Sequence, residues 1–186
     1  MNKYLIFLSL VGVLSAGEIV SSGEVLVNGK VLSKTTKIKH GDTIETKANS
    51  SIRFNVANDA FSAKEKSKFK LEKLGNKKIL NVLNGGVMAV FGKGNHGVAT
   101  PNMTAGIRGT GTYTLVRDAK TYFCTCYGHT EVGAHGETKD LKATHHKMIW
   151  VTNDKIKAAK TMENHSDDEL RVLEAMVGRV VPFHKK

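Results

Sequence analysis

The feature that most constrains the fold is a long series of short alternating segments, which runs from Glu18 to about Val151. Apolar and polar residues alternate within each segment, and Gly, Asn or Asp separates one segment from the next, as in half-buried β-strands joined by turns. The segment 51–56, for example, places Ile52, Phe54 and Val56 on one face. No part of this region has a convincing helical period. The sequence therefore predicts an all-β domain, a solenoid- or sandwich-like stack of short strands.

The turn residues support this prediction. Asn28-Gly29 follows the apolar segment 24–27, and this dipeptide is the strongest short signal for a β-hairpin. The triplet Asn84-Gly85-Gly86 separates the strand-like segments 79–83 and 87–91. We therefore expect a hairpin at residues 28–29 and a break between strands at residues 84–86.

The C-terminal part of the sequence has a different pattern. Ser166 and Glu169 have the spacing of a capping box, in which each side chain bonds the other residue's backbone amide at the start of a helix. Leu170, Leu173 and Val177 then follow at helical spacing. We expect one C-terminal α-helix of about three turns, which covers an open end or edge of the β-domain.

Residues 1–17 have the order of a secretory signal peptide: Lys3, an apolar run from Leu5 to Leu14, and then small residues. A retained N-terminal anchor is the alternative, although the run is short for a membrane span. No second apolar run reaches membrane length, so we expect no transmembrane segment after cleavage. The predicted organisation is a signal peptide at 1–17, a β-domain at 18–152, and a C-terminal helix and tail at 153–186. The expected location is the periplasm of a Gram-negative bacterium, or outside the cell.

The sequence is strongly basic, with a formal net charge of +11. Such a charge favours anionic partners such as lipid head groups, cell-wall polymers or nucleic acid, and export argues against nucleic acid. The segment Lys64–Lys78 concentrates this charge, with seven lysines in fifteen residues. We expect the partner to be an unknown protein or an anionic envelope surface; a solvated basic surface without a partner is the alternative.

Two groups of short motifs resemble the FecR domain, which is named for a periplasmic regulator of iron-citrate uptake. The first group spans 23–54 and contains His40-Gly-Asp-Thr-Ile-Glu-Thr46. The second spans 83–116 and contains Thr100-Pro101 and Arg108-Gly-Thr110. Together they cover roughly residues 22–143. The resemblance implies an all-β, solenoid-like stack of short strands in the extracytoplasmic space.

The resemblance does not extend to the ends of the chain. The iron-citrate regulator needs a cytoplasmic helical domain and a membrane span, whereas this chain has a signal peptide at that place. Direct control of a sigma factor is therefore not expected. No Ser-His-Asp or paired-carboxylate arrangement has supporting context. We expect a standalone FecR-like protein that is not an enzyme and serves as a binding, signalling-accessory or scaffold protein.

Cys124 and Cys126 are the only cysteines, and they lie in a strand-like segment that ends at Gly128. Side chains alternate along a strand, so both sulfurs point to the same face. In the FecR pattern Phe123 and Thr125 face the core, which would place the two cysteines on the opposite face, nearer solvent. Exposed thiols seldom stay free in an oxidising compartment.

Three roles are open for this pair. A disulfide across one residue would be strained, and a thiol-redox enzyme lacks the usual C-x-x-C motif. A copper or zinc site fits the geometry better, because two thiolates on one face can chelate one ion. Histidines would complete that site, whereas His40, His96, His165 and His184 are expected to be ordinary surface residues. The candidate metal ligands are Cys124, Cys126, His145, His146 and His129.

Overall fold

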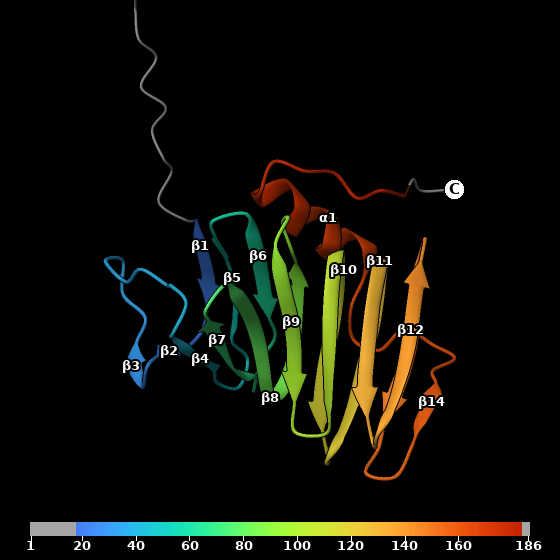
Figure 1. The fold of residues 1–186 in the computed structure, drawn as a ribbon. Helices are drawn as coiled ribbons and strands as arrows, with labels where there is room; N and C mark the ends of the chain where they lie inside the picture. The colour runs from blue at the N-terminus through green and yellow to red at the C-terminus, as the bar shows by residue number, and fades with distance from the viewer. Residues whose placement is uncertain (1–17, 184–186) are drawn as a thin grey trace, which may run out of the picture.

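The computed structural model describes residues 18–183, so the expected signal peptide at 1–17 lies outside the described residues. The described chain is mostly β-structure with one α-helix, α1 (Asp167–Met176), which confirms the expected fold class (Figure 1). The strands are β1 (Ile19–Ser22), β2 (Val25–Val27), β3 (Lys30–Val31), β4 (Thr43–Thr46), β5 (Ser51–Val56), β6 (Asp59–Ala63), β7 (Lys68–Leu74), β8 (Lys77–Val90), β9 (Asn95–Thr100), β10 (Met103–Arg117), β11 (Lys120–Ala134), β12 (Glu137–Ala143), β13 (Lys147–Val151) and β14 (Ile156–Ala158).

The strands are hydrogen-bonded in the order β14-β13-β11-β10-β9-β8-β7-β4-β2-β3, and β1, β5, β6 and β12 branch from this path. All pairs are antiparallel except β8 with β9. The Asn28-Gly29 hairpin is confirmed, because both residues have positive φ and Val27 pairs with Lys30. The sheet continues through β14, which lies beyond residue 152.

The three longest strands bend instead of ending where glycine interrupts them. β8 runs through Gly85 (φ +77°), so the break expected at residues 84–86 is a bend within one strand. β10 bends at Gly109 and β11 at Gly128, where the register between these strands shifts. The bend in β11 is sharp enough for the hydroxyls of Thr125 and Thr130 to lie 2.7 Å apart.

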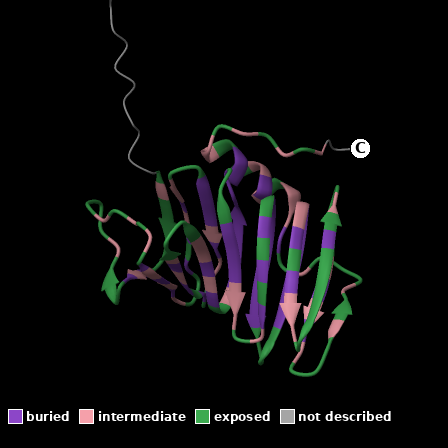
Figure 2. Cartoon of the chain, in the orientation of Figure 1, coloured by how far each residue is buried: buried purple, intermediate pink, exposed green. Residues whose placement is uncertain are grey.

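The two arms of a bent strand differ in burial, which indicates that they belong to two different layers (Figure 2). Along Met103–Arg108, buried and exposed residues alternate, so this arm has one face in water. The other arm of β10 is buried at every residue from 110 to 116, and the arm of β11 beside it is buried from 121 to 127. These two arms form an inner layer, which is covered on both faces.

Two hydrophobic cores cover those faces. The sheet core lies between the layers and holds residues of both arms of β11, such as Phe123 and Val132. The helix core lies on the other face of the inner layer, under α1 and the segments beside it. Its buried members are Ala60, Met88, Val90, Tyr113, Leu115, Tyr122, Cys124, Cys126, Tyr127, Leu170 and Leu173.

The expected C-terminal helix is confirmed in detail. Ser166 is the N-cap, and it forms the reciprocal capping box with Glu169. α1 lies across one end of the strands in Figure 1, and its Leu170 and Leu173 pack on the inner layer. Gly178, at φ +69°, follows the helix end and donates its amide to the carbonyl of Ala175. Within residues 18–183, no helix is long and apolar enough to cross a membrane.

The lysine-rich segment 64–78 comprises β7, the turns on either side of it and the first two residues of β8. Phe69 and Leu71 are buried, and Lys68 and Lys70 lie on the other face, as the alternation predicted. Several lysines of the segment have acidic partners, which reduces the net positive charge of the segment's surroundings. The ion pairs are Lys64–Glu169, Lys68–Glu45, Lys70–Glu72 and Lys78–Asp59.

The bend in β11 can be tested with two matched glycines. Gly128 and Gly136 both have positive φ, but a Cβ at Gly128 would lie 2.4 Å from Thr110 Cγ2, whereas one at Gly136 would meet nothing within 4 Å. Gly136→Ala should lower the free energy of unfolding by about 1 to 2 kcal/mol, the backbone cost alone. Gly128→Ala should cost about 1 to 3 kcal/mol more, because the neighbours must also move. Urea unfolding of both variants measures the difference, and equal losses would contradict the close packing of this bend.

Candidate functional site

Four metal-ligating side chains from three separate segments meet in the helix core. Cys124 and Cys126 come from the inner arm of β11. His146 lies in the turn before β13, and its backbone N–H donates to the carbonyl of Cys126 at 2.9 Å. His165 lies directly before Ser166, the N-cap of α1. The folded chain therefore brings together residues that are up to 41 positions apart in the sequence.

The geometry of these four residues is compact. One donor atom from each lies within 4.8 Å of the donor atoms of the other three. Cys124 Sγ is 3.3 Å from His146 Nδ1. The two cysteines are not joined in a disulfide, both are fully buried, and the His146 side chain is only 6% exposed. The four residues are called the Cys/His cluster below.

Oxygen atoms behind the two histidines fix which ring nitrogen faces the sulfurs. His146 Nε2 lies 2.7 Å from Asp167 Oδ1, so this nitrogen donates to the carboxylate and Nδ1 faces Cys124. His165 Nδ1 donates to the carbonyl of Glu163 at 2.8 Å, which leaves Nε2 as the free lone pair. That buried Nε2 lies beside Cys124 and has no hydrogen bond of good geometry among the described residues. An oxygen that orients a histidine in this way is typical of metal-binding histidines.

The electrostatics of the cluster make the two cysteines unequal. Burial alone would raise the pKa of the Cys124 thiol, but hydrogen bonds from Cys126 and His146 outweigh burial and lower it. Burial and the neighbouring Cys124 raise the pKa of Cys126. Burial would lower the pKa of His146, but its bonds to Cys124 and Asp167 raise it. In the metal-free protein the cluster thus favours a Cys124 thiolate beside a His146 imidazolium.

The cluster contains three of the five candidate metal ligands, namely Cys124, Cys126 and His146. His145 lies outside it, with Nε2 3.0 Å from Asp167 and its ring beside Phe183. His129 lies on the other side of the bend in β11, where it bonds Asp140 of β12.

His165 is the fourth member of the cluster, although we expected an ordinary surface histidine. It is 8% exposed, and its ring stacks on Tyr113 with the ring centres 4.5 Å apart. The sequence feature that could have identified His165 is its position one residue before a capping box. A residue that leads into a docked helix lies close to the surface that the helix covers.

The expected exposure of the two cysteines is wrong. They do lie on the face opposite Phe123, as strand alternation predicted, but α1 and the segments beside it cover that face. The outward side of a strand faces solvent only when no other element packs there.

Cys124, His146 and Asp167 also form a line of thiol, imidazole and carboxylate, an order that activates nucleophiles in acyl-transfer enzymes. A nucleophile must reach its substrate, and Cys124 is 0% exposed. In this conformation the arrangement therefore fits ligation of an ion better than attack on a substrate.

The pKa directions predict how the metal-free protein titrates. At about pH 7, which is below the ordinary pKa of a thiol, we expect the metal-free protein to show the ultraviolet absorbance of a thiolate. His146→Gln should raise the pKa of Cys124, because it removes the cationic donor, whereas His145→Gln is the control and should leave it low. Identical titrations of the wild type and His146→Gln would show that the thiolate–imidazolium pair is absent.

The same shifts give the sign of two contributions to stability. The lowered pKa means that the Cys124 thiolate stabilises the fold above the ordinary thiol pKa, and that this contribution is lost as the pH falls through the folded pKa. The raised pKa of His146 acts in the opposite direction, since its contribution is complete below the ordinary histidine pKa and is lost as the pH rises through the folded value.

Comparisons with known proteins give a likeness in fold. No protein-family profile and no curated protein matches the sequence. A 1.65 Å crystal structure of a Parabacteroides distasonis protein, provisionally described as an anti-sigma factor, aligns with a TM-score of 0.56 and 12% identity over 63% of this chain and 58% of that one. A 2.50 Å structure with the same description aligns with a TM-score of 0.42 and 12% identity over 76% of this chain and 60% of that one. This chain thus spans less than two thirds of either protein, and at this identity the first alignment shows a shared fold alone.

Proposed function

We propose that this protein is an exported, non-enzymatic accessory protein with a FecR-like scaffold, and that its Cys/His cluster binds one zinc or copper(I) ion. The single observation that carries the metal-binding function is the convergence of four donor atoms within 4.8 Å of one another. Two thiols and two imidazoles are a common ligand set for a closed, four-coordinate structural zinc site.

The surroundings of the donors support this function. The outer nitrogens of His146 and His165 are held by oxygens, so their inner nitrogens face the sulfurs without further rearrangement. The buried Nε2 of His165 has no hydrogen bond of good geometry beyond its contact with Cys124, and a buried polar atom that is poorly paired loses its hydration at a cost. A bound ion would give this atom a partner.

Charge favours zinc over copper(I). Two thiolates carry two negative charges, and the neutral histidines add none. Zn²⁺ would balance the thiolates, whereas Cu⁺ would leave one uncompensated negative charge among fully buried side chains. Copper(I) is nevertheless well suited to thiolate ligands, so both ions belong in the test.

The accessory role has separate support. The motifs at 23–54 and 83–116 resemble the FecR domain, and the structural neighbour that aligns with a TM-score of 0.56 is provisionally described as an anti-sigma factor. Both support a role in signalling more than a role in catalysis. Export is inferred from the pattern of residues 1–17, and it makes the periplasm of a Gram-negative bacterium our proposed location.

A metal ion in the cluster would also fasten the C-terminal helix. His165 precedes α1 directly, and Asp167, its first residue, holds His146. The other ligands belong to β11 and to the turn before β13. One ion would thus cross-link three segments, and structural zinc sites contribute directly to folding free energy.

Metal analysis of the purified protein tests the proposal. We expect one zinc or copper ion per chain, and a rise in the thermal midpoint when metal-free protein receives that ion. Cys124→Ser, Cys126→Ser and His165→Gln should each abolish stoichiometric binding, because each removes one ligand. His129→Gln is the matched control and should bind normally, because this histidine bonds Asp140 away from the cluster.

Two results would contradict metal binding. One is a metal-free protein that does not bind added zinc or copper(I) under reducing conditions. The other result has two parts. Protein taken from the periplasm has a mass two hydrogen atoms below that of the reduced chain, as a disulfide requires, and the same protein fails to bind metal after reduction. This second result would leave a disulfide or a thiol-redox role as the function of Cys124 and Cys126.

Hydrogen exchange tests whether metal fastens the helix. Metal-loaded protein should exchange the amides of α1 at least about tenfold more slowly than metal-free protein, because opening of the helix would require a ligand to dissociate. The amides of β4, which belongs to neither the cluster nor its neighbours, should exchange at the same rate in both. Equal exchange in α1 with metal bound would show that the ion does not hold the helix.

A further inference from the structure

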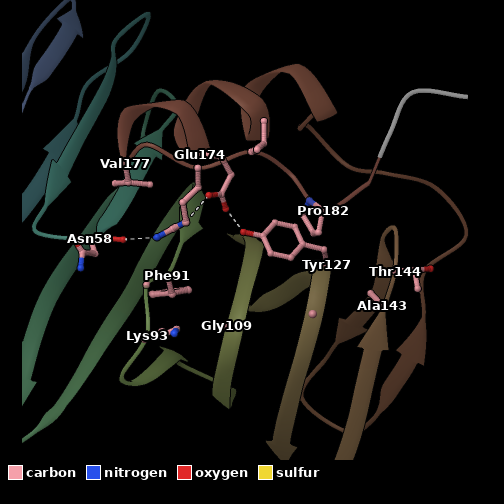
Figure 3. A pocket seen from close by; sticks show the side chains of 14 residues that line it. Asn58, Phe91, Lys93, Gly109, Tyr127, Ala143, Thr144, Glu174, Val177 and Pro182 are labelled. Atoms are coloured by element: carbon pink, nitrogen blue, oxygen red, sulfur yellow. Dashed lines mark hydrogen bonds and ion pairs between the residues drawn. The ribbon is translucent and has the colours of Figure 1, made fainter.

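A second candidate site is a groove beside α1, and none of the four residues of the Cys/His cluster lines it (Figure 3). Its floor includes the two bends of the inner layer, at Gly109 and Gly128, and one wall is the end of α1 with the segment 177–182. Its volume is about 820 Å³, within the range of small-molecule sites.

The groove has apolar walls. Phe91 and Tyr127 present mostly buried rings from the sheet side. Val177, Val180 and Pro182 line it from the C-terminal segment. Val180 is 88% exposed, so part of this apolar surface is open to solvent. A ligand with an apolar body would bury that surface and gain free energy from its removal from water.

The charged side chains of the groove leave an excess of one positive charge. Glu174 is buried and accepts hydrogen bonds from the Tyr127 hydroxyl and, at 2.7 Å, from Arg179 Nε. Arg179 Nη1 donates to the carbonyl of Asn58, and the dashed line that ends at Asn58 in Figure 3 marks this bond. The charge of Glu174 is therefore balanced by Arg179. Lys93 is exposed, and no acidic side chain among residues 18–183 forms an ion pair with it.

One further donor is available at the same place. Arg179 Nη2 is buried and has no hydrogen-bond partner among the described residues. An anionic oxygen beside it would satisfy this donor, and hydrogen bonds between charged groups are among the strongest in proteins. The groove thus combines an apolar wall with two cationic side chains, one of which has a spare donor.

We propose that this groove binds a small amphipathic carboxylate, such as a medium-chain fatty acid. The apolar chain lies between Tyr127 and Val180, and the carboxylate lies near Lys93 and Arg179. A neutral ligand would leave the excess positive charge unpaired, and a cationic ligand would be repelled by it. The binding site does not require metal, because its lining includes none of the four residues of the Cys/His cluster.

Calorimetric titration with octanoate tests this proposal, and octylammonium has the same chain with the opposite charge. We expect octanoate to bind with a Kd below about 1 mM and octylammonium to bind at least about tenfold more weakly. Lys93→Gln should weaken octanoate binding by about tenfold, because it removes the unpaired charge. Lys120→Gln is the matched control: this exposed lysine does not line the groove, and its removal should leave the affinity unchanged.

A second variant tests the apolar wall. Val180→Asp places a carboxylate at an 88% exposed position, so it should fold normally and still weaken octanoate binding at least about tenfold. Equal affinities for octanoate and octylammonium, or an unchanged affinity in Lys93→Gln, would overturn the proposal. Competition by phosphatidylglycerol vesicles that contain no free fatty acid would also overturn it, because it would assign the groove to a membrane surface.

Discussion

The two buried faces of the inner layer are the constraint on which the rest of the structure depends. The strands bend at Gly109 and Gly128, and one arm of each then lies against the other layer. Its opposite face is apolar as well, so it needs α1 as a cover. The alternation along β11 therefore directs Phe123 into the sheet core and both cysteines into the helix core. The chemical environment of the thiols follows from this double burial.

Local patterns in the sequence predicted the local structure well. The Asn28-Gly29 hairpin, the capping box that starts at Ser166 and the alternation in β7 all depend on neighbouring residues, and the structure contains each of them. The glycines at 84–86 were harder to interpret, because a glycine with positive φ permits either a chain reversal or a bend within a strand. The packing of distant strands decides between these outcomes in β8.

The candidate site could be predicted only in part, because it too depends on how distant segments pack. A strand period places Cys124 and Cys126 together, but it does not show whether another element covers them. His146 follows His145 directly, and only the turn geometry, with φ +46° at His146, decides which of the two faces the sulfurs. His165 belongs to a segment whose location depends on where α1 packs. Each of these features needs long-range contacts that no short sequence window contains.

Both candidate sites use the same C-terminal segment. His165 and Asp167 join its start to the Cys/His cluster, while Glu174 and Arg179 join its later part to the groove. The apolar contacts of Leu170 and Leu173 lie between them and connect the two sites through one helix. A ligand at either site would therefore stabilise the docked position that the other site also requires, and such shared ordering couples binding sites even without a large structural change.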